Sequence, residues 1–179
     1  VLATEDRHFY THFGIDWRGI GRSILKNLRL RNPSQFVGGS TIPQQLVRSI
    51  LLSREKTVPR KIKEIILTLE LERRYSKDEI LEFYLNQIPL GSTVYGVGAA
   101  SQFYFGKPVA ELSLAESAII SALIQAPSYY SPFGSHKEEL MARKNYVLTS
   151  MKLLGYITQE QATEAQSQEL TFQDPGLSI

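Results

Sequence analysis

The chain has 179 residues, of which 42% are hydrophobic, and it carries 20 basic against 18 acidic side chains. That length and apolar content suffice for one compact hydrophobic core, which predicts a single domain. The sequence contains no cysteine, so a disulfide framework, a thiolate metal site and a cysteine nucleophile are excluded. A formal net charge of +2 does not by itself indicate a nucleic-acid partner.

The printed sequence shows neither the ~20 consecutive apolar residues of a membrane-spanning helix nor a signal segment with a charged start and an apolar run. It opens directly on Val1-Leu2-Ala3, without a polar lead-in. We therefore expect an excised domain of a longer protein, in which anchors and signals lie outside this sequence.

Helix-forming patterns dominate the chain. Capping boxes, in which a Ser or Thr caps a helix and a Glu or Gln three residues later reaches back, are predicted at four places. Sustained alternation of apolar and polar residues, the pattern of a half-buried strand, is absent. The sequence therefore predicts an all-α domain. The four capping boxes pair Thr41 with Gln44, Ser76 with Glu79, Ser113 with Glu116, and Thr158 with Gln161.

Residues 5–14 combine acidic, histidine and aromatic side chains. On a helix, Glu5, His8, Phe9 and His12 would share one side. Aromatic neighbours would partly desolvate the Glu5 carboxylate, which suits a general base. A capped helix end, with His12 satisfied by a backbone carbonyl, explains the same pattern. A zinc site is disfavoured because the two histidines have only one carboxylate close by.

A cationic amphipathic helix is predicted over residues 16–31, where five basic residues face a single aspartate. Together with a tryptophan, this pattern is typical of a segment that lies in a membrane interface. An ordinary surface helix with a solvated basic face fits equally well. A DNA-recognition helix fits less well, because no second helix with a tight turn precedes it. The apolar side carries Trp17, Ile20, Ile24, Leu25 and Leu28.

Two glycines lead into the helix that Thr41 caps. Backbone N–H groups and the helix dipole at this point favour an anion, and Ser40 and Thr41 add hydroxyl donors. The pattern is not a P-loop, because no lysine follows at the required place. The amides of Gln44 and Gln45 suit sugar hydroxyls or an N-acetyl group, and Arg48 lies one turn further on. A flexible loop with a well-made cap is the alternative.

Five basic and two acidic residues lie between residues 54 and 64. On a helix, Arg60 and Lys61 precede Glu64 by four and three positions and can face it. A basic strip beside a carboxylate is what a diphosphate leaving group requires. A solvated helix with ordinary ion pairs is the alternative.

The same helix has an apolar stripe of Ile62, Ile65, Ile66 and Leu69. We expect the three isoleucines to bury part of the helix. That burial would place Glu64 and its basic neighbours at the edge of the core.

Further along, a predicted helix over residues 81–86 runs into a turn near Tyr95. Asn86 and Tyr95 are candidate ligand contacts, although a helix end followed by a turn explains most of this segment. From about Gln166 the sequence is polar without a core pattern, which is typical of the start of a linker. The predicted boundaries are residues 1–165 for the domain and 166–179 for a linker or tail.

Each segment is weakly diagnostic alone, but their order resembles the peptidoglycan glycosyltransferase domain of class A penicillin-binding proteins and their monofunctional relatives, glycosyltransferase family 51. The matching motifs cover nearly the whole chain. They are Glu5-Asp6-x-x-Phe9-x-x-His12-x-Gly14, Gly39-Ser40-Thr41-Ile42-x-Gln44-Gln45-Leu46, Arg60-Lys61-x-x-Glu64, Ser76-Lys77-x-x-Ile80-Leu81-Glu82-x-Tyr84-Leu85-Asn86, Tyr95-Gly96, Tyr104-Phe105-Gly106-Lys107, and Leu112-Ser113-Leu114-Ala115-Glu116.

The resemblance implies a lysozyme-like all-α fold with a smaller membrane-associated lobe at about residues 15–40. It also implies an enzyme at the extracytoplasmic, periplasmic-side face of the bacterial cytoplasmic membrane. The implied substrates are lipid II, a disaccharide-peptide on a polyprenyl diphosphate, and the growing glycan chain. No nucleotide is required because the sugar is already activated, and no nucleic acid is implied. The helices over residues 143–158 resemble the bifunctional synthases, so a transpeptidase domain is expected to follow.

By the same resemblance, Glu5 is the base that deprotonates the acceptor hydroxyl, and Glu64 is the second carboxylate, which organises the leaving diphosphate directly or through a Mg or Mn ion. The implied reaction inverts the anomeric carbon. No cofactor is required on this view, and the sequence has no metal-ligand cluster. The implied substrate contacts are His12, Ser40, Thr41, Gln44, Gln45, Arg48, Lys56, Arg60, Lys61, Asn86 and Tyr95.

This sequence departs from the family pattern at three positions, two of which are implied substrate contacts. Arg48 stands where lysine is usual and Lys56 where arginine is usual, which preserves charge but changes bidentate geometry. Pro43 stands where threonine is common.

Two other functions remain open. A lytic enzyme of similar fold would need a protonated carboxylic acid, and the cations near Glu64 argue against it, since a sugar leaving group is neutral. A non-catalytic membrane- or glycan-binding module would have no reason to retain both Glu5 and Glu64.

Overall fold

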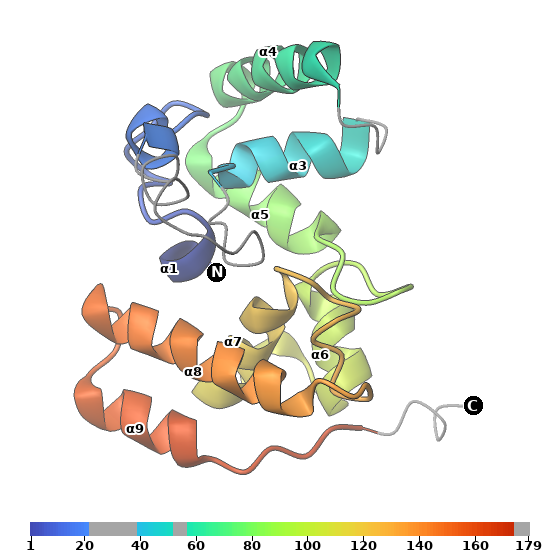
Figure 1. Ribbon diagram of the computed structural model, residues 1–179, viewed down its shortest axis with the longest axis vertical. Coiled ribbons are helices and arrows are strands. Elements are labelled where there is room, and N and C mark those ends of the chain that lie inside the picture. Colours follow the sequence, from blue (N-terminus) through green and yellow to red (C-terminus); the bar gives the residue numbers. More distant parts are fainter. Residues whose placement is uncertain (22–38, 52–56, 174–179) are drawn as a thin grey trace, which may run out of the picture. The chain divides into compact units, whose positions relative to one another are not determined.

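The computed structural model describes residues 1–21, 39–51 and 57–173. Within these ranges there is no strand, and the only pairing of that kind is an isolated antiparallel bridge between Pro89 and Tyr95. The predicted all-α fold is therefore confirmed. None of the helices in these ranges has the length and hydrophobicity needed to cross a membrane. The helices are α1 (Leu2–Glu5), α3 (Ile42–Leu51), α4 (Val58–Arg74), α5 (Lys77–Gln87), α6 (Val97–Phe105), the 3-10 turn η2 (Val109–Glu111), α7 (Leu114–Leu123), α8 (Lys137–Leu153) and α9 (Gln159–Ser167) (Figure 1).

Most of the predicted membrane-associated lobe lies outside the described residues. Residues 17–21 are helical, and the Oδ1 atom of Asp16 accepts a hydrogen bond of 2.8 Å from the amide of Gly19, as an N-cap does. Trp17 is 69% exposed at the start of this turn. The predicted amphipathic helix from residue 22 onward and the predicted contact Lys56 belong to segments that the structure does not describe.

All four predicted capping boxes are present, since in each the side chains and backbone amides of the pair bond reciprocally. Thr41 and Gln44 open α3, and Ser76 and Glu79 open α5. The boxes of Ser113 with Glu116 and of Thr158 with Gln161 open α7 and α9. Local sequence therefore determines where these helices begin.

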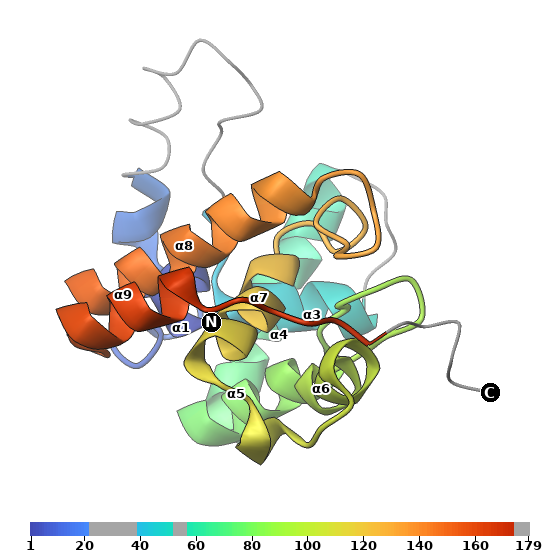
Figure 2. The same ribbon diagram turned by 90° about the horizontal axis from the view of Figure 1, so that it is seen from below.

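The chain divides into two compact units, each described here by itself. The C-terminal unit comprises Leu85 onward, and its core is α7, which contacts α6, α8 and α9 (Figure 2). Nearly every residue of α7 is buried, from Ala115 through Leu123, because helices cover it on several sides. Two of these neighbours, α8 and α9, lie side by side in both ribbon views.

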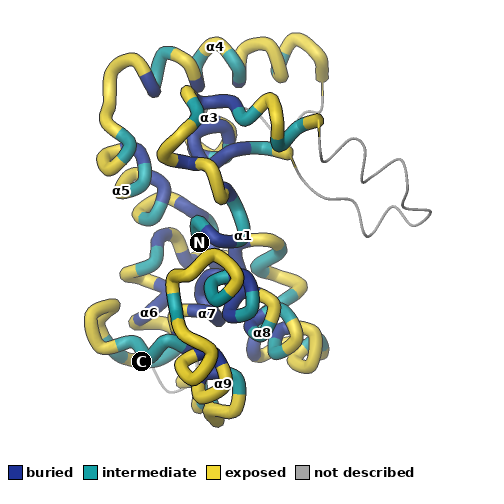
Figure 3. Tube along the Cα trace, turned by 90° about the vertical axis from the view of Figure 1, so that its left-hand side faces the viewer, coloured by how far each residue is buried: buried dark blue, intermediate teal, exposed yellow. Residues whose placement is uncertain are grey.

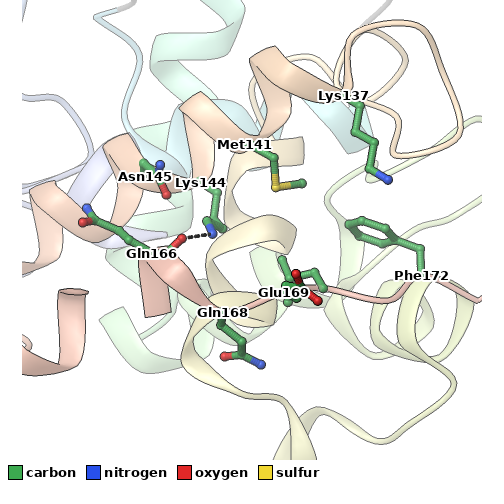
Figure 4. A pocket seen from close by; sticks show the side chains of 9 residues that line it. Lys137, Met141, Lys144, Asn145, Gln166, Gln168, Glu169 and Phe172 are labelled. Atoms are coloured by element: carbon green, nitrogen blue, oxygen red, sulfur yellow. Dashed lines mark hydrogen bonds between the residues drawn. The ribbon is translucent and has the colours of Figure 1, made fainter. Parts of the chain in front are cut away.

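A buried lysine joins α8 to α9. Lys144 is 3% exposed, and its Nζ donates hydrogen bonds of 3.2 and 2.9 Å to the carbonyl oxygens of Ala165 and Gln166, at the end of α9 (Figure 4). These are carbonyls that the helix itself cannot satisfy. Burial lowers the pKa of Lys144. A hollow of about 350 Å³ lies beside it, and none of the predicted site residues lines that hollow.

The segment after α9 packs against the C-terminal unit as far as residue 173. The amide of Gln173 donates to the carbonyl oxygen of Tyr104 at 2.9 Å, and the ring of Phe172 lies 5.5 Å from that of Phe105. The predicted domain boundary after residue 165 stays a prediction; the helix itself continues to Ser167.

The N-terminal unit, Thr4–Tyr84, contains a helix whose polarity is inverted. The inward side of α4 carries Glu64, Thr68 and Glu72, all buried. The prediction that the isoleucines bury this helix is wrong for Ile62 and Ile66, which are 53% and 60% exposed. Helical spacing identified a real apolar stripe but not which way it faces. The polar side of α4 faces the loop at Gly14, and α4 packs against α3. Buried and exposed stretches alternate along α4 in Figure 3.

The loop approaches α4 at a glycine. Gly14 has a φ of +73°, and a Cβ atom placed on it would lie 2.9 Å from Cγ2 of Thr68. Its carbonyl oxygen accepts a hydrogen bond of 2.5 Å from Oγ1 of Thr41. A side chain at this position would therefore push the loop away from both α3 and α4.

The capping box of α7 yields a pH-dependent prediction. Burial opposes ionisation of Glu116, but the hydrogen bonds from Lys107 and Ser113 prevail and lower its pKa below 4.5. A carboxylate whose pKa is lowered by folding stabilises the protein above its ordinary pKa and loses that effect as the pH falls through the lowered value.

We therefore expect Glu116→Gln to reduce the free energy of unfolding at pH 7 by about 1–2 kcal/mol. The difference from the unsubstituted protein should shrink below about pH 4. Urea unfolding at several pH values measures both effects, and Glu111→Gln, in the neighbouring exposed turn, is the control. A difference that stays constant down to pH 3 would contradict the assignment.

Candidate active site

The segment around Glu5 is a series of turns and not a continued helix. Helix α1 ends at Glu5, and turns follow over residues 7–11, so Phe9 is buried while His8 is exposed. The expectation that these residues share one helical side is therefore wrong. The ring of His12 is also not satisfied by a backbone carbonyl: its Nε2 lies 2.9 Å from Oδ2 of Asp6, and its Nδ1 has no hydrogen-bond partner among the residues that the structure describes.

Asp6 connects this segment to α3. Its buried carboxylate bonds His12 and also accepts a hydrogen bond of 2.9 Å from the amide of Ile42, the first residue of α3. A carboxylate at that point satisfies a free helix amide and interacts favourably with the helix dipole. Asp6 belongs to the first sequence motif, but its connecting role was not predicted; an acidic residue beside the predicted base was the signal for it.

Glu5 is half-buried and lies within hydrogen-bonding reach of α3. The Nε2 atom of Gln45 is 3.4 Å from Oε2 of Glu5. The other end of the same amide, Oε1, accepts a hydrogen bond of 2.9 Å from the hydroxyl of Tyr84 on α5. The structure thus brings together Glu5 and one of the predicted substrate contacts.

The other predicted contacts on α3 differ in exposure. Thr41 and Gln44 are buried, and their side chains make the cap hydrogen bonds and the bond to Gly14. Ser40, partly exposed, accepts a hydrogen bond of 3.4 Å at its carbonyl oxygen from Gln45. Arg48 is exposed on the last turn of α3. Of this group, Ser40, Gln45 and Arg48 have side chains that solvent reaches.

Glu64 is a buried carboxylate with one open oxygen. It is 1% exposed, and its Oε1 accepts a hydrogen bond of 2.5 Å from Nζ of Lys61, whose side chain is 47% exposed. Its Oε2 has no hydrogen-bond partner among the residues that the structure describes. A buried carboxylate normally satisfies both oxygens, so an open one marks a place for a further cation or donor. Arg60 lies one turn before it on α4.

Asn86 and Tyr95 belong to the C-terminal unit, and the chain folds back there to bring them close together. The amide of Gly96 donates to the carbonyl oxygen of Ile88 at 2.9 Å, and Tyr95 pairs with Pro89. Gly96, with a φ of +80°, has no room for a Cβ atom, which would lie 2.5 Å from the carbonyl oxygen of Asn86. Both predicted side chains are exposed.

Comparison with known proteins supports a relation over most of the chain. The model of a family described as transglycosylase matches residues 1–152. The chain is 52% identical to penicillin-binding protein 1A of Aquifex aeolicus over 95% of its length, and 46% identical to penicillin-binding protein 1A of Escherichia coli over 99%. The crystal structure of penicillin-binding protein 1A from Haemophilus influenzae aligns with 74% of this chain and 16% of that chain, at 33% identity and a TM-score of 0.52.

The fold and these matches define a helical enzyme domain that transfers glycosyl groups, which confirms the lysozyme-like fold that the resemblance implied. The chain belongs to the transglycosylase family, and it is a peptidoglycan glycosyltransferase domain of the kind found in penicillin-binding proteins. It spans only 23% and 22% of the length of the Aquifex and Escherichia relatives.

The connecting role of Asp6 is tested by replacing its carboxylate with the amide of asparagine. Asp6→Asn removes the charge that His12 and the start of α3 share, and we expect the free energy of unfolding to fall by about 1–3 kcal/mol. Asp78→Asn is the matched control, because that exposed carboxylate accepts one hydrogen bond of 3.0 Å, from Tyr10. Chemical denaturation of both variants measures the difference. Equal, small effects would show that Asp6 does not hold the segment to α3.

Proposed function

We propose that this domain polymerises lipid II into glycan strands. The acceptor sugar hydroxyl loses its proton to Glu5, its oxygen bonds the anomeric carbon of the growing chain, and the bond from that carbon to the diphosphate oxygen breaks. The polyprenyl diphosphate leaves with the bonding electrons. Attack opposite the leaving group inverts the anomeric carbon.

The position of Glu5 is the observation that carries this proposal. It lies at the end of α1, half-buried, with Asp6 fixed to α3 on one side and the amide of Gln45 on the other. A general base needs this kind of fixed geometry, within reach of a substrate proton and of solvent. His12, Ser40 and Gln45 are proposed to contact the sugars. Asn86 and Tyr95, which belong to the C-terminal unit, stay predicted contacts.

Glu64 and the cations near it are proposed to bind and stabilise the diphosphates. Arg48 on α3 and Arg60 and Lys61 on α4 supply positive charge from two helices that pack together. Lys56 is proposed for the same role. Such charge stabilises a leaving diphosphate as it develops. We keep a Mg or Mn ion as a proposal, with Glu64 as its protein ligand; no group of three His, Asp or Glu that fits a metal ion occurs in the described ranges.

The outer side of α4 supports attachment to a membrane surface. Val58, Ile62 and Ile66 are 75%, 53% and 60% exposed, and lysines 61 and 63 flank them. An apolar stripe edged by lysines is the pattern of a helix that lies in a lipid interface. Trp17, also exposed, adds a residue type that favours this interface. We propose that the domain works on the extracytoplasmic face of the cytoplasmic membrane.

A longer synthase is the proposed context of the domain. The chain covers about a fifth to a quarter of relatives named penicillin-binding proteins. We propose that a transpeptidase domain follows it in the same chain, so that strands made here are cross-linked nearby.

The base is tested by Glu5→Gln, which keeps the shape and removes the proton acceptor. We expect polymerisation of lipid II to fall by about 100-fold or more, because general bases contribute that much to rate. Glu82→Gln, an exposed carboxylate on α5, should retain full activity. Gel separation of labelled glycan products measures both. Full activity of Glu5→Gln would place the base elsewhere, and cleavage of glycan without synthesis would indicate a lytic enzyme.

The membrane surface is tested by Ile62→Ser combined with Ile66→Ser. Both side chains are exposed, so we expect the free energy of unfolding to change by less than about 0.5 kcal/mol. Binding to vesicles of phosphatidylglycerol and phosphatidylcholine should weaken several-fold, as sedimentation of the domain with the vesicles measures. The control is Leu153→Ser, which removes an exposed apolar residue of α8. Unchanged binding by the double variant would exclude α4 from the lipid contact.

A further inference from the structure

Tyr84 is a buried tyrosine to which the proposed mechanism gives no role. It lies on α5, is 1% exposed and has its hydroxyl 2.9 Å from Oε1 of Gln45. The hydroxyl is therefore directed into the N-terminal unit, at the residue of α3 that reaches Glu5.

The orientation of the Gln45 amide follows from its hydrogen-bond partners. Two acceptors face one end of that amide, since Nε2 lies 3.4 Å from Oε2 of Glu5 and 3.4 Å from the carbonyl oxygen of Ser40. A backbone carbonyl can only accept, so this end must be the NH₂ group. The other end is then the oxygen, which requires a donor, and the hydroxyl of Tyr84 supplies it.

We propose that Tyr84 is a positioning residue for the base: by donating to Gln45 it holds the amide NH₂ of that residue against the Glu5 carboxylate. This inference rests on the proposed function, in which Glu5 removes the acceptor proton. Without the hydroxyl, the Gln45 oxygen loses its donor, and only two long contacts of 3.4 Å still hold the amide. The loosened amide would then let the Glu5 carboxylate move away from its substrate.

The electrostatics of Tyr84 agree with this geometry. Burial raises the pKa of Tyr84, and the negative charges of Glu5 and Asp6 raise it further, whereas Arg48 lowers it. The phenol therefore keeps its proton at neutral pH and serves as a permanent donor.

The first test is Tyr84→Phe, which removes only the hydroxyl. We expect kcat for lipid II polymerisation to fall by about 10- to 100-fold with KM nearly unchanged, because a displaced base affects the chemical step more than binding. Tyr104→Phe is the matched control: it removes another buried tyrosine hydroxyl, which donates to the carbonyl oxygen of Leu90 at 2.7 Å, in the C-terminal unit. It should lose comparable thermal stability and keep its kcat.

The second test asks whether Tyr84 acts through Gln45. In a Gln45→Met background the amide is absent, so adding Tyr84→Phe should change kcat by less than about twofold, which is the mark of two residues that work as one unit. An equal loss of kcat from Tyr84→Phe in both backgrounds would overturn the inference. So would full kcat in the single Tyr84→Phe variant.

A conservative variant covers the case in which Tyr84→Phe does not fold. The substitution Tyr84→4-aminophenylalanine fills the same space and keeps a donor at the same place, and it should retain kcat within about threefold. A folded variant of this kind with a kcat as low as that of Gln45→Met would contradict the inference. If the unsubstituted domain fails to polymerise lipid II, or Glu5→Gln is fully active, the proposed function fails instead, whatever Tyr84 does.

Discussion

The buried carboxylate of Asp6 is the constraint on which the N-terminal unit depends. It holds the amide of Ile42 at the start of α3 and the ring of His12 in the preceding loop, at 2.9 Å each. Because both partners are buried polar groups, removing the carboxylate would leave two of them without a hydrogen bond at once. The neighbouring residue, Glu5, directly precedes the fixed Asp6 in the chain, which links this hydrogen-bonded pair to the placement of the proposed base.

The second feature is the inverted polarity of α4. A helix in a soluble domain normally buries its apolar side, but α4 buries Glu64 and Glu72 and exposes Ile62 and Ile66. The buried acids carry a free-energy cost that their lysine partners offset, with Lys61 on Glu64 and Lys77 on Glu72. The polar side of α4 thereby faces the interior of the unit, while its apolar side is exposed, and this exposed side is the one proposed to contact lipid.

The C-terminal unit is stabilised differently, by an apolar helix with other helices around it. Helix α7 is buried along nearly its whole length, and its start is fixed by the capping box and by the ion pair of Lys107 with Glu116. Lys144 satisfies the last carbonyls of α9 from within the core. No chemistry is assigned to these groups, and their regular packing contrasts with the polar interior beside Glu5.

Sequence alone determined the helical class, all four capping boxes and the family, because caps, helical spacing and ordered motifs are local properties of the chain. It did not determine which side of α4 is buried. Helical spacing allows either the side of Ile62 or the side of Glu64 to face the interior, and only contact with α3 and the loop selects between these two sides. Nor did it predict the partner of His12 or the hydroxyl that donates to Gln45. Those contacts join residues up to 39 positions apart, and only tertiary folding brings such residues together.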